Sequence, residues 1–401
     1  MTDVPPRIKR FAVVLAPDRH CLEDIRSPKV RLLPPDQAAL PNHHILVVPS
    51  CDRLGLLDRL HALPPETWTN PRNGVTTLVL DASLEGRPHD PPWALAVDGF
   101  LQGVGVPSSR VAYVTQNRGY AAEDERFRRA RGLGPGMRVV VFDYWVRAIA
   151  RQHEVDGEAA FEERLAAYRA RPRRRRWRFL SLNWTLRPAK TLFLLRLIED
   201  GLFDQGAISV NPIRKRMKKM EAALLHLPAF ADLNQRLAPY LPRLREVAGT
   251  TFETHPRWGP VFEHPLAEQG ESWFSVVTET EMGDRPCRIT EKPLKALMNF
   301  HPLIMLANPG ALQLLRDYGF QTFGGLFDER YDEELDQRRR FEMVYAEVRR
   351  LCAMDEAELD RLDRQLDEVI VFNARHGLVE LPRLFRDRYD PGLIADIMGP
   401  G

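Results

Sequence analysis

Short apolar runs alternate with amphipathic stretches in the last third of the chain. The run at 273–277 is apolar throughout and short enough to form a buried strand. A helix is predicted after it, with Thr290 as the N-cap and Pro293 in the first turn. A second strand at 302–306 precedes a helix at 311–318. This order of strand, helix, strand and helix predicts an α/β domain with a mostly parallel sheet.

The N-terminal half repeats the same pattern. A helix is predicted at 92–103, where apolar side chains recur at helical spacing. Continuous apolar runs of the buried parallel type predict strands at 11–15, 44–49, 76–80, 110–117 and 137–145. We therefore expect a second doubly wound α/β unit in this half.

The most basic segment of the chain lies between the two halves. We expect an N-terminal domain at 1–168, an arginine-rich linker at 169–178 and a C-terminal domain at 179–375. Residues 376–401 form a tail, for which a crossing back to the N-terminal domain is one expected arrangement. Apolar and charged patterns predict a strand at 177–183 and helices at 158–169, 191–200, 211–246, 338–352 and 356–374.

Composition places the chain among ordinary soluble globular proteins. It has 401 residues, of which 44% are hydrophobic and 28% charged, and this length favours two domains. The net charge of +2 gives no global field, so no nucleic-acid partner is expected. Four scattered cysteines lack metal-ligand spacing and fit a reducing compartment. Without a signal or membrane segment, we expect a cytoplasmic protein, with a peripheral position at the inner membrane face as an alternative.

Two loops of the C-terminal half carry charged side chains where ligands of parallel sheets bind. Glu279 follows the predicted strand at 273–277, and Glu291 and Lys292 open the next helix. Lys292 suits phosphate and Glu291 suits ribose hydroxyls, although both residues could simply be solvated first-turn side chains. Gly310, in the loop after the strand at 302–306, would let the backbone approach a ligand closely.

Arg187 and Lys190 lie where the helix after the strand at 177–183 begins. Exposed cations at a helix N-terminus are unfavourable next to its positive dipole end, so this pair favours an anionic ligand. A strand of this kind followed by a loop with two basic residues also resembles bacterial and phage glycosyltransferase-like proteins. The resemblance implies that this loop faces the same crevice as Lys292, where the three cations could clamp a diphosphate.

A family resemblance adds to this interpretation. Glu279, Thr290, Glu291 and Lys292, followed by Pro302 and by Pro309 with Gly310, resemble the donor-binding motif of the α-1,3-fucosyltransferases and related bacterial and phage glycosyltransferase-like proteins. The resemblance implies a GT-B fold, in which two Rossmann-like domains face each other across a cleft and the C-terminal one binds a nucleotide sugar without a metal. Thr280 and Arg288 depart from the motif, which usually has Asn and an aromatic residue there.

The N-terminal half holds candidates for a general base. Asp81 and Glu85 follow the predicted strand at 76–80, and a base on this side could deprotonate an acceptor hydroxyl. The alternative is that Asp81 caps a turn and Glu85 is a surface carboxylate. His89 is a further candidate base.

The arginine block from Arg173 to Arg178 has three interpretations. Such runs are commonly solvated linkers or docking surfaces, but they also bind phosphate-rich partners such as an anionic lipid or membrane surface. Nucleic acid is less favoured because the block is short and only Trp177 could stack on a base.

Together, these features predict a metal-independent and inverting GT-B glycosyltransferase that needs no cofactor. It would move a sugar from a nucleotide donor, with a GDP-sugar favoured, to a glycan, glycolipid or similar hydroxyl acceptor. Arg187, Lys190 and Lys292 would stabilise the charge of the leaving nucleotide. A CMP- or UDP-sugar donor, and a non-catalytic protein that binds nucleotide sugars or polyanions on a degenerate GT-B scaffold, remain as alternatives.

Overall fold

The computed structural model describes residues 11–14, 20–22, 30–33, 45–49, 53–84, 86–183, 186–210, 228–250, 252, 267–280, 282–283 and 288–399. The chain divides into two compact units. Unit 1 combines Met1–Tyr144 with Leu384–Gly401, and unit 2 is Trp145–Arg383. The boundary expected at residue 168 lies inside unit 2, so the arginine-rich stretch at 169–178 connects two elements of one unit.

Unit 1 is built on a six-stranded sheet, sheet A, in which every pairing of the described strands is parallel. The strand order is β2-β1-β3-β4-β5-β6. The interior strands β3 and β5 are buried along their whole length, which explains their largely apolar sequences. The strands are β1 (Phe11–Val14), β2 (Val30–Leu33), β3 (Ile45–Pro49), β4 (Thr77–Ala82), β5 (Val111–Thr115) and β6 (Arg138–Val141).

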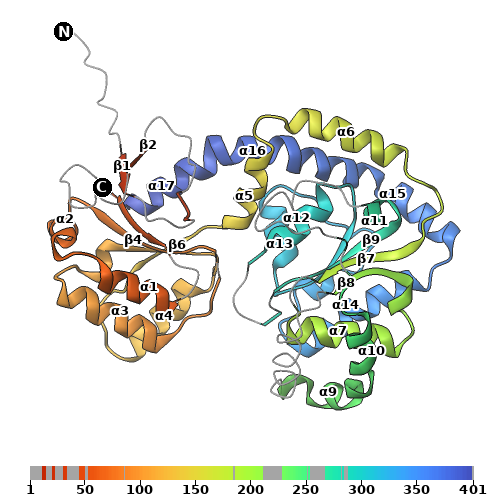
Figure 1. The fold of residues 1–401 in the computed structure, drawn as a ribbon, viewed down its shortest axis with the longest axis horizontal. Helices are drawn as coiled ribbons and strands as arrows, with labels where there is room; N and C mark the ends of the chain where they lie inside the picture. The colour runs from red at the N-terminus through yellow and green to blue at the C-terminus, as the bar shows by residue number, and fades with distance from the viewer. Residues whose placement is uncertain are drawn as a thin grey trace, which may run out of the picture. The chain divides into compact units, whose positions relative to one another are not determined.

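Helices cover both faces of sheet A. In Figure 1, α1 (Arg53–Ala62), α3 (Pro91–Gly103) and α4 (Tyr120–Ala130) lie below the sheet, and α17 (Asp390–Met398) lies above it and contacts β4 and β6. Asp90 caps α3 by accepting a hydrogen bond from the Trp93 amide at 3.2 Å. The core under the sheet joins side chains of α1, α3 and β4, including Leu56, Trp93, Val97, Leu78 and Leu80.

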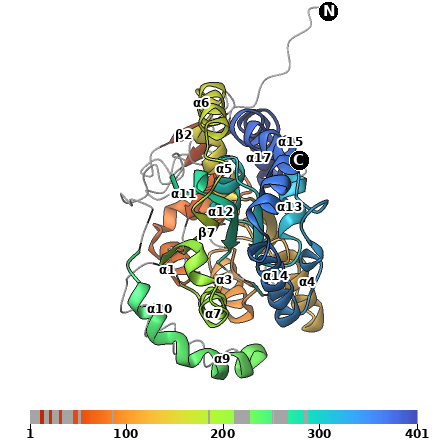
Figure 2. The ribbon, with the colours of Figure 1, turned by 90° about the vertical axis from the view of Figure 1, so that its right-hand side faces the viewer.

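Unit 2 contains a four-stranded parallel sheet, sheet B, with the order β10-β9-β7-β8. Its strands are β7 (Trp177–Asn183), β8 (Gly206–Val210), β9 (Ser272–Thr278) and β10 (Leu303–Leu306). In Figure 1, α12 and α13 lie on one side of the sheet and α7 and α14 on the other. Figure 2 shows α9 and α10 one after the other, and both contact α7.

Besides α5 (Tyr144–Gln152), which spans the boundary of the units, the described helices of unit 2 include α6 (Gly157–Arg169), α7 (Pro188–Glu199), α9 (Ala231–Leu237), α10 (Leu241–Val247), α11 (Ala267–Gly270), α12 (Glu291–Leu297), α13 (Ala311–Asp317), α14 (Gln337–Cys352) and α15 (Glu356–Arg375). From α15 the chain stays helical through two π-helical turns, His376–Glu380 and Phe385–Tyr389, that flank α16 (Leu381–Leu384), and it ends in α17. None of the helices that the structure describes is both long and apolar enough to span a membrane.

The predicted fold class is confirmed, because each unit is a Rossmann-like layer arrangement around a parallel sheet. One predicted strand is wrong in its second half. The run at 137–145 was expected to be one strand, but β6 ends at Val141 and α5 (Tyr144–Gln152) begins at Tyr144. The buried side chains Val146 and Ile149 lie one turn apart, so the helical period continues past the apolar run that suggested a strand. Of the helical stretch predicted at 211–246, residues 211–227 lie outside the described residues.

Candidate anion-binding site at the switch point of sheet B

The order of sheet B creates a crevice between the carboxyl ends of β7 and β9. From β7 the chain goes to β8 on one side, and it later returns to β9 on the other side. At such a switch point the following loops leave the sheet in opposite directions, and ligands of open α/β sheets bind there. The two strand ends are joined, since the Thr278 hydroxyl of β9 donates to Asn183 Oδ1 of β7 at 2.9 Å.

Glu279 connects the end of β9 to the start of α12. Its side chain is buried, and its carboxylate accepts hydrogen bonds from the Thr290 amide at 2.9 Å and the Thr290 hydroxyl at 2.7 Å. Thr290 in turn caps α12, as predicted from the sequence, by accepting from the Lys292 amide. Glu279 and Thr290 therefore fix the position of the helix start and of the charged residues on it.

Lys292 and Glu291, in the first turn of α12, form an ion pair with each other. Lys292 Nζ lies 3.1 Å from Glu291 Oε1 and 3.8 Å from Glu279 Oε2, and it donates to the Thr290 hydroxyl at 2.9 Å. Burial acts to lower the pKa of Lys292, but the two carboxylates outweigh it and the pKa is raised. Burial likewise acts to raise the pKa of Glu291, and Lys292 outweighs it, so that pKa is lowered. These pKa shifts favour the charged form of both residues. Both side chains are also 22% exposed and are therefore open to solvent.

Lys190 lies in the first turn of α7, on the β7 side of the crevice. It is only 2% exposed, and none of the described residues forms a hydrogen bond or ion pair with its ammonium group. Burial and the charge of Lys292 lower its pKa to about 7, against the opposing effect of Glu279 and Glu291. Arg187, the exposed N-cap residue of the same helix, adds further positive charge.

The structure adds a fourth cation, Arg288, that the sequence pattern marked only as a departure from the family motif. Arg288 is buried, and its charge acts to lower the pKa of Lys292, so the two lie close together. In the sequence, its position two residues before the N-cap Thr290 could have marked Arg288 as a further cation of this site. The described residues around the crevice thus include four cations, Arg187, Lys190, Arg288 and Lys292, beside the carboxylates of Glu279 and Glu291.

Gly310 is on the loop after β10, next to this crevice. It adopts a left-handed conformation with φ of +78°, which explains the glycine, and its amide donates to the Asp332 carbonyl at 2.7 Å. The Asp332 carboxylate accepts from the amides of Leu312 and Gln313 at 2.9 and 3.1 Å. A carboxylate of the chain thus occupies the N-terminus of α13, and a ligand contact of Gly310 stays a prediction.

The loops after β9 and β10 are held together by Arg340 of α14. This buried guanidinium donates to the carbonyl oxygens of Ala307 at 3.0 Å and Gly283 at 3.3 Å, and also to that of Met282. Five donors in a rigid plane suit such a task. Arg340 therefore supports the wall of the crevice.

The candidate bases lie in unit 1, and the structure describes two of the three. Asp81 is buried at the end of β4, where its carboxylate accepts from the amides of Cys21 at 2.5 Å and Ser83 at 2.8 Å. Burial raises its pKa, against the effect of these hydrogen bonds. His89 Nε2 lies 2.9 Å from Asp124 Oδ1, inside a cluster with Tyr120 and Phe127. Glu85 lies outside the described residues.

Arginines of the stretch at 169–178 bind helix α15 of the same unit. Arg171 and Arg175 lie 2.5 and 2.8 Å from Asp363 of α15, and Arg175 also stacks over Trp273 at 4.3 Å. Arg174 lies 3.4 Å from Glu356, although it is 90% exposed. Intramolecular docking therefore accounts for the buried part of the block.

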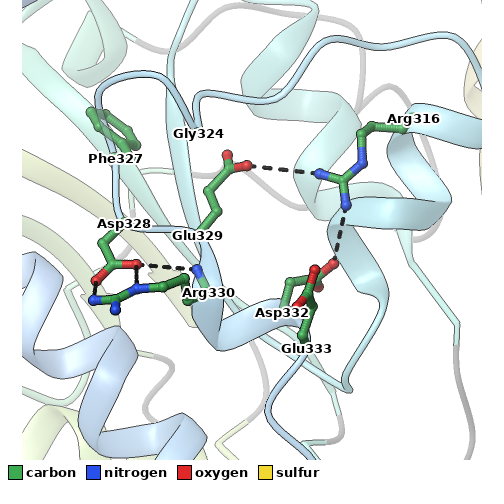
Figure 3. A pocket seen from close by; sticks show the side chains of 8 residues that line it. All are labelled: Arg316, Gly324, Phe327, Asp328, Glu329, Arg330, Asp332 and Glu333. Atoms are coloured by element: carbon green, nitrogen blue, oxygen red, sulfur yellow. Dashed lines mark hydrogen bonds and ion pairs between the residues drawn. The ribbon is translucent and has the colours of Figure 1, made fainter.

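A separate hollow of about 420 Å³ lies beside α13 (Figure 3). Most of its charged side chains pair with one another: Arg316 lies 3.7 Å from Glu329 and 3.6 Å from Asp332, and Arg330 lies 2.5 Å from Asp328. It is lined by Arg316, Gly324, Phe327, Asp328, Glu329, Arg330, Asp332 and Glu333. Because these charges are compensated inside the hollow, it is a weaker candidate for a charged ligand than the crevice.

Comparisons with known proteins give one distant likeness. No protein-family model and no curated protein matches the chain. The crystal structure of α,α-trehalose 6-phosphate synthase from Burkholderia multivorans is similar with a TM-score of 0.42 and 13% identity, over 89% of this chain and 72% of that chain.

Within the part of the chain that the structure describes, no group of acidic, histidine or cysteine side chains is arranged to hold a metal ion.

Proposed function

We propose that the chain is a glycosyltransferase that takes a sugar from a nucleotide donor bound at the switch point of sheet B. The observation that carries this proposal is the lysine pair of the crevice: Lys190 is buried with no partner among the described residues, and Lys292 is held between two carboxylates. An anion at this point would receive charge-assisted hydrogen bonds from both ammonium groups.

The charges of the crevice support a nucleoside diphosphate as the leaving group. Three cations at the starts of α7 and α12, Arg187, Lys190 and Lys292, can contact a diphosphate more fully than a single phosphate, which favours a GDP- or UDP-linked donor over a CMP-linked one. As the bond to the sugar breaks, negative charge grows on the diphosphate, and Arg187, Lys190 and Lys292 would stabilise it without a metal ion. The exposed Glu291 carboxylate could accept hydrogen bonds from the ribose hydroxyls.

The acceptor in this proposal is a hydroxyl group of a glycan, glycolipid or similar molecule. A base from unit 1 would remove its proton, and attack from the face opposite the leaving group would invert the anomeric carbon. Glu85 is the first candidate because the Asp81 carboxylate already holds two backbone amides. Arg173, Arg174 and Arg176 are exposed, and in the proposal they could attract an anionic lipid surface to a cytoplasmic enzyme.

A second candidate is a non-catalytic protein that binds nucleotide sugars. The observation in its favour is that Asp81 and His89, the described candidate bases, are both engaged within unit 1. This candidate shares the anion site and differs only in the absence of turnover.

The test is a thermal-shift screen with GDP, UDP and CMP, followed by donor hydrolysis with the corresponding sugar nucleotides. A ligand at 100 times its Kd should add about 2.7 kcal/mol of stability. Binding with slow hydrolysis supports the transferase, and binding without any turnover supports the second candidate. If no nucleotide shifts the melting temperature, the crevice is not a nucleotide site.

A further inference from the structure

Lys190 is unusual among the cations of the crevice because its side chain is almost fully buried and no described residue pairs with its amino group. It is 2% exposed, and the described residues offer it neither a hydrogen bond nor an ion pair. An isolated ammonium group in such a place is strongly disfavoured, and a buried lysine escapes by losing its proton. Lys292, by contrast, has three oxygen partners within 3.8 Å and stays charged.

The groups that face Lys190 divide into two sets. Lys292 from α12 and Arg187 from α7 itself repel its positive charge, while Glu279 at the end of β9 and Glu291 on α12 attract it. Both carboxylates already bind other donors: Glu279 accepts from Thr290, and Glu291 pairs with Lys292. Neither carboxylate therefore serves as a direct partner of Lys190, and its amino group has no carboxylate of its own among the described residues.

The start of α7 supplies a second, independent feature of an anion site. Arg187 at the N-cap makes no side-chain cap bond, and Pro188 opens the helix. The first-turn amides of this 12-residue helix therefore receive no side-chain cap from Arg187, and Lys190 belongs to the same turn.

We propose that binding of a nucleoside diphosphate in the crevice is coupled to the uptake of one proton from solvent by the Lys190 amino group. This inference rests on the proposed function, since it assumes that the crevice binds that anion. In the unbound protein the amine is largely neutral at mildly alkaline pH. The phosphate oxygens then provide the missing partners, the amine becomes an ammonium, and the bound diphosphate gains one more charge-assisted contact.

The pKa of about 7 for Lys190 gives the expected pH dependence. Proton uptake on binding should be about half a proton at pH 7 and about 0.9 at pH 8, because the free amine is then mostly neutral. The Kd should rise about eightfold between pH 7.5 and 8.5, as long as bound Lys190 stays protonated. Alkaline conditions therefore weaken nucleotide binding.

The experiment is calorimetric titration of the full chain with GDP and UDP at pH 8 in buffers of different ionisation enthalpy. The nucleotide phosphates are already ionised at this pH, so a dependence on the buffer reports proton uptake by the protein. Lys190→Arg stays charged and Lys190→Met stays neutral, so both should bind without proton uptake and with a Kd that does not change with pH. Lys292→Arg is the matched control and should retain the uptake of the wild type, because Lys292 is already charged.

The outcomes separate the two proposals. Binding with uptake below about 0.1 proton at pH 8, or equal uptake in the wild type and in both Lys190 variants, overturns the coupling and leaves the nucleotide site intact. Loss of uptake in Lys292→Arg would instead assign the proton to Lys292. If neither GDP nor UDP binds the wild type, the proposed function fails and the coupling fails with it.

Discussion

The carboxyl edges of the two sheets use their polar side chains differently. At the edge of sheet A, the buried Asp81 and Asn117 bind backbone: Asp81 holds the amides of Cys21 and Ser83, and Asn117 accepts from the Gly119 amide at 2.9 Å. At the edge of sheet B, charged side chains bind one another, and no described residue pairs with the amino group of Lys190. Both edges occupy the position where α/β sheets bind ligands, but among the described residues the cluster of cations lies at the second.

This difference distinguishes polar side chains that stabilise the fold from those that are available to bind a ligand. Polar groups that satisfy nearby amides lower the free energy of the folded state and need nothing further. A buried cation with no partner raises that free energy, and such a feature is typical of binding sites. The comparison predicts that substitution of the side chains that bind backbone at sheet A, such as Asp81, alters stability, while substitution of the charged side chains at sheet B alters nucleotide affinity.

The largest expected effect concerns the loop after β4, where Glu85 follows Asp81. If this loop supplies the base, Glu85→Gln should lower turnover by about two to four powers of ten, because the amide cannot accept the acceptor proton. Nucleotide affinity should stay nearly the same. Steady-state rates and nucleotide titrations on the same preparation measure both.

Two companion variants locate the base if Glu85 is not the one. A normal rate in Glu85→Gln with a collapse in Asp81→Asn or His89→Ala would move the role to that residue. Full rate in all three variants would show that this loop of unit 1 takes no part in catalysis.

The next effect is at Lys292. Lys292→Ala removes a charge-assisted phosphate contact, and the loss of nucleotide binding should be about 1.5 to 3 kcal/mol. Arg330→Ala is the control, because Arg330 is 82% exposed and pairs only locally with Asp328 in the hollow beside α13. Equal affinities of the Lys292 variant and the wild type, with the fold intact, would remove the crevice from the proposal.

Asp81→Asn tests the structural side of the comparison. An amide can accept only one of the two hydrogen bonds that the carboxylate now accepts, and its NH2 group would face the other donor. We expect a loss of about 1 to 3 kcal/mol of unfolding free energy, measured by urea denaturation, with no change in nucleotide affinity. An affinity loss as large as that of Lys292→Ala would contradict the distinction between the two edges.

Local sequence patterns were sufficient to predict the two parallel sheets and the start of α12. Thr290 with Glu291 and Lys292 forms a cap followed by a first turn, and these signals involve residues close in sequence. The prediction of one strand at 137–145 also relied on a local pattern and was wrong in its second half. An apolar stretch fits a strand and a buried helix equally well.

Contacts between distant segments could not be predicted. Arg175 docks on Asp363, 188 residues away, and nothing near Arg175 in the sequence indicates that partner. The burial of Lys190 and the nearness of Arg288 likewise depend on β7 pairing with β9, which the order of elements along the chain leaves open. The sequence thus indicated most of the charged residues of the crevice, but not which of them lacks a partner.

The smallest effect is the most selective test of how the crevice reads a nucleotide. Glu291→Gln should lower the preference for ribonucleotides over deoxyribonucleotides by about threefold to tenfold, the value of one ordinary hydrogen bond, because an amide oxygen accepts more weakly than a carboxylate. Absolute affinity is a poor measure here, since the substitution also releases Lys292 from its partner at 3.1 Å and lets it bind phosphate more strongly. The ratio of GDP to dGDP affinity cancels that gain, because both ligands carry the same diphosphate. Glu333→Gln, the same change at an exposed position of the hollow beside α13, should leave the ratio as it is in the wild type. An unchanged ratio in Glu291→Gln would mean that Glu291 serves only to hold Lys292 in place.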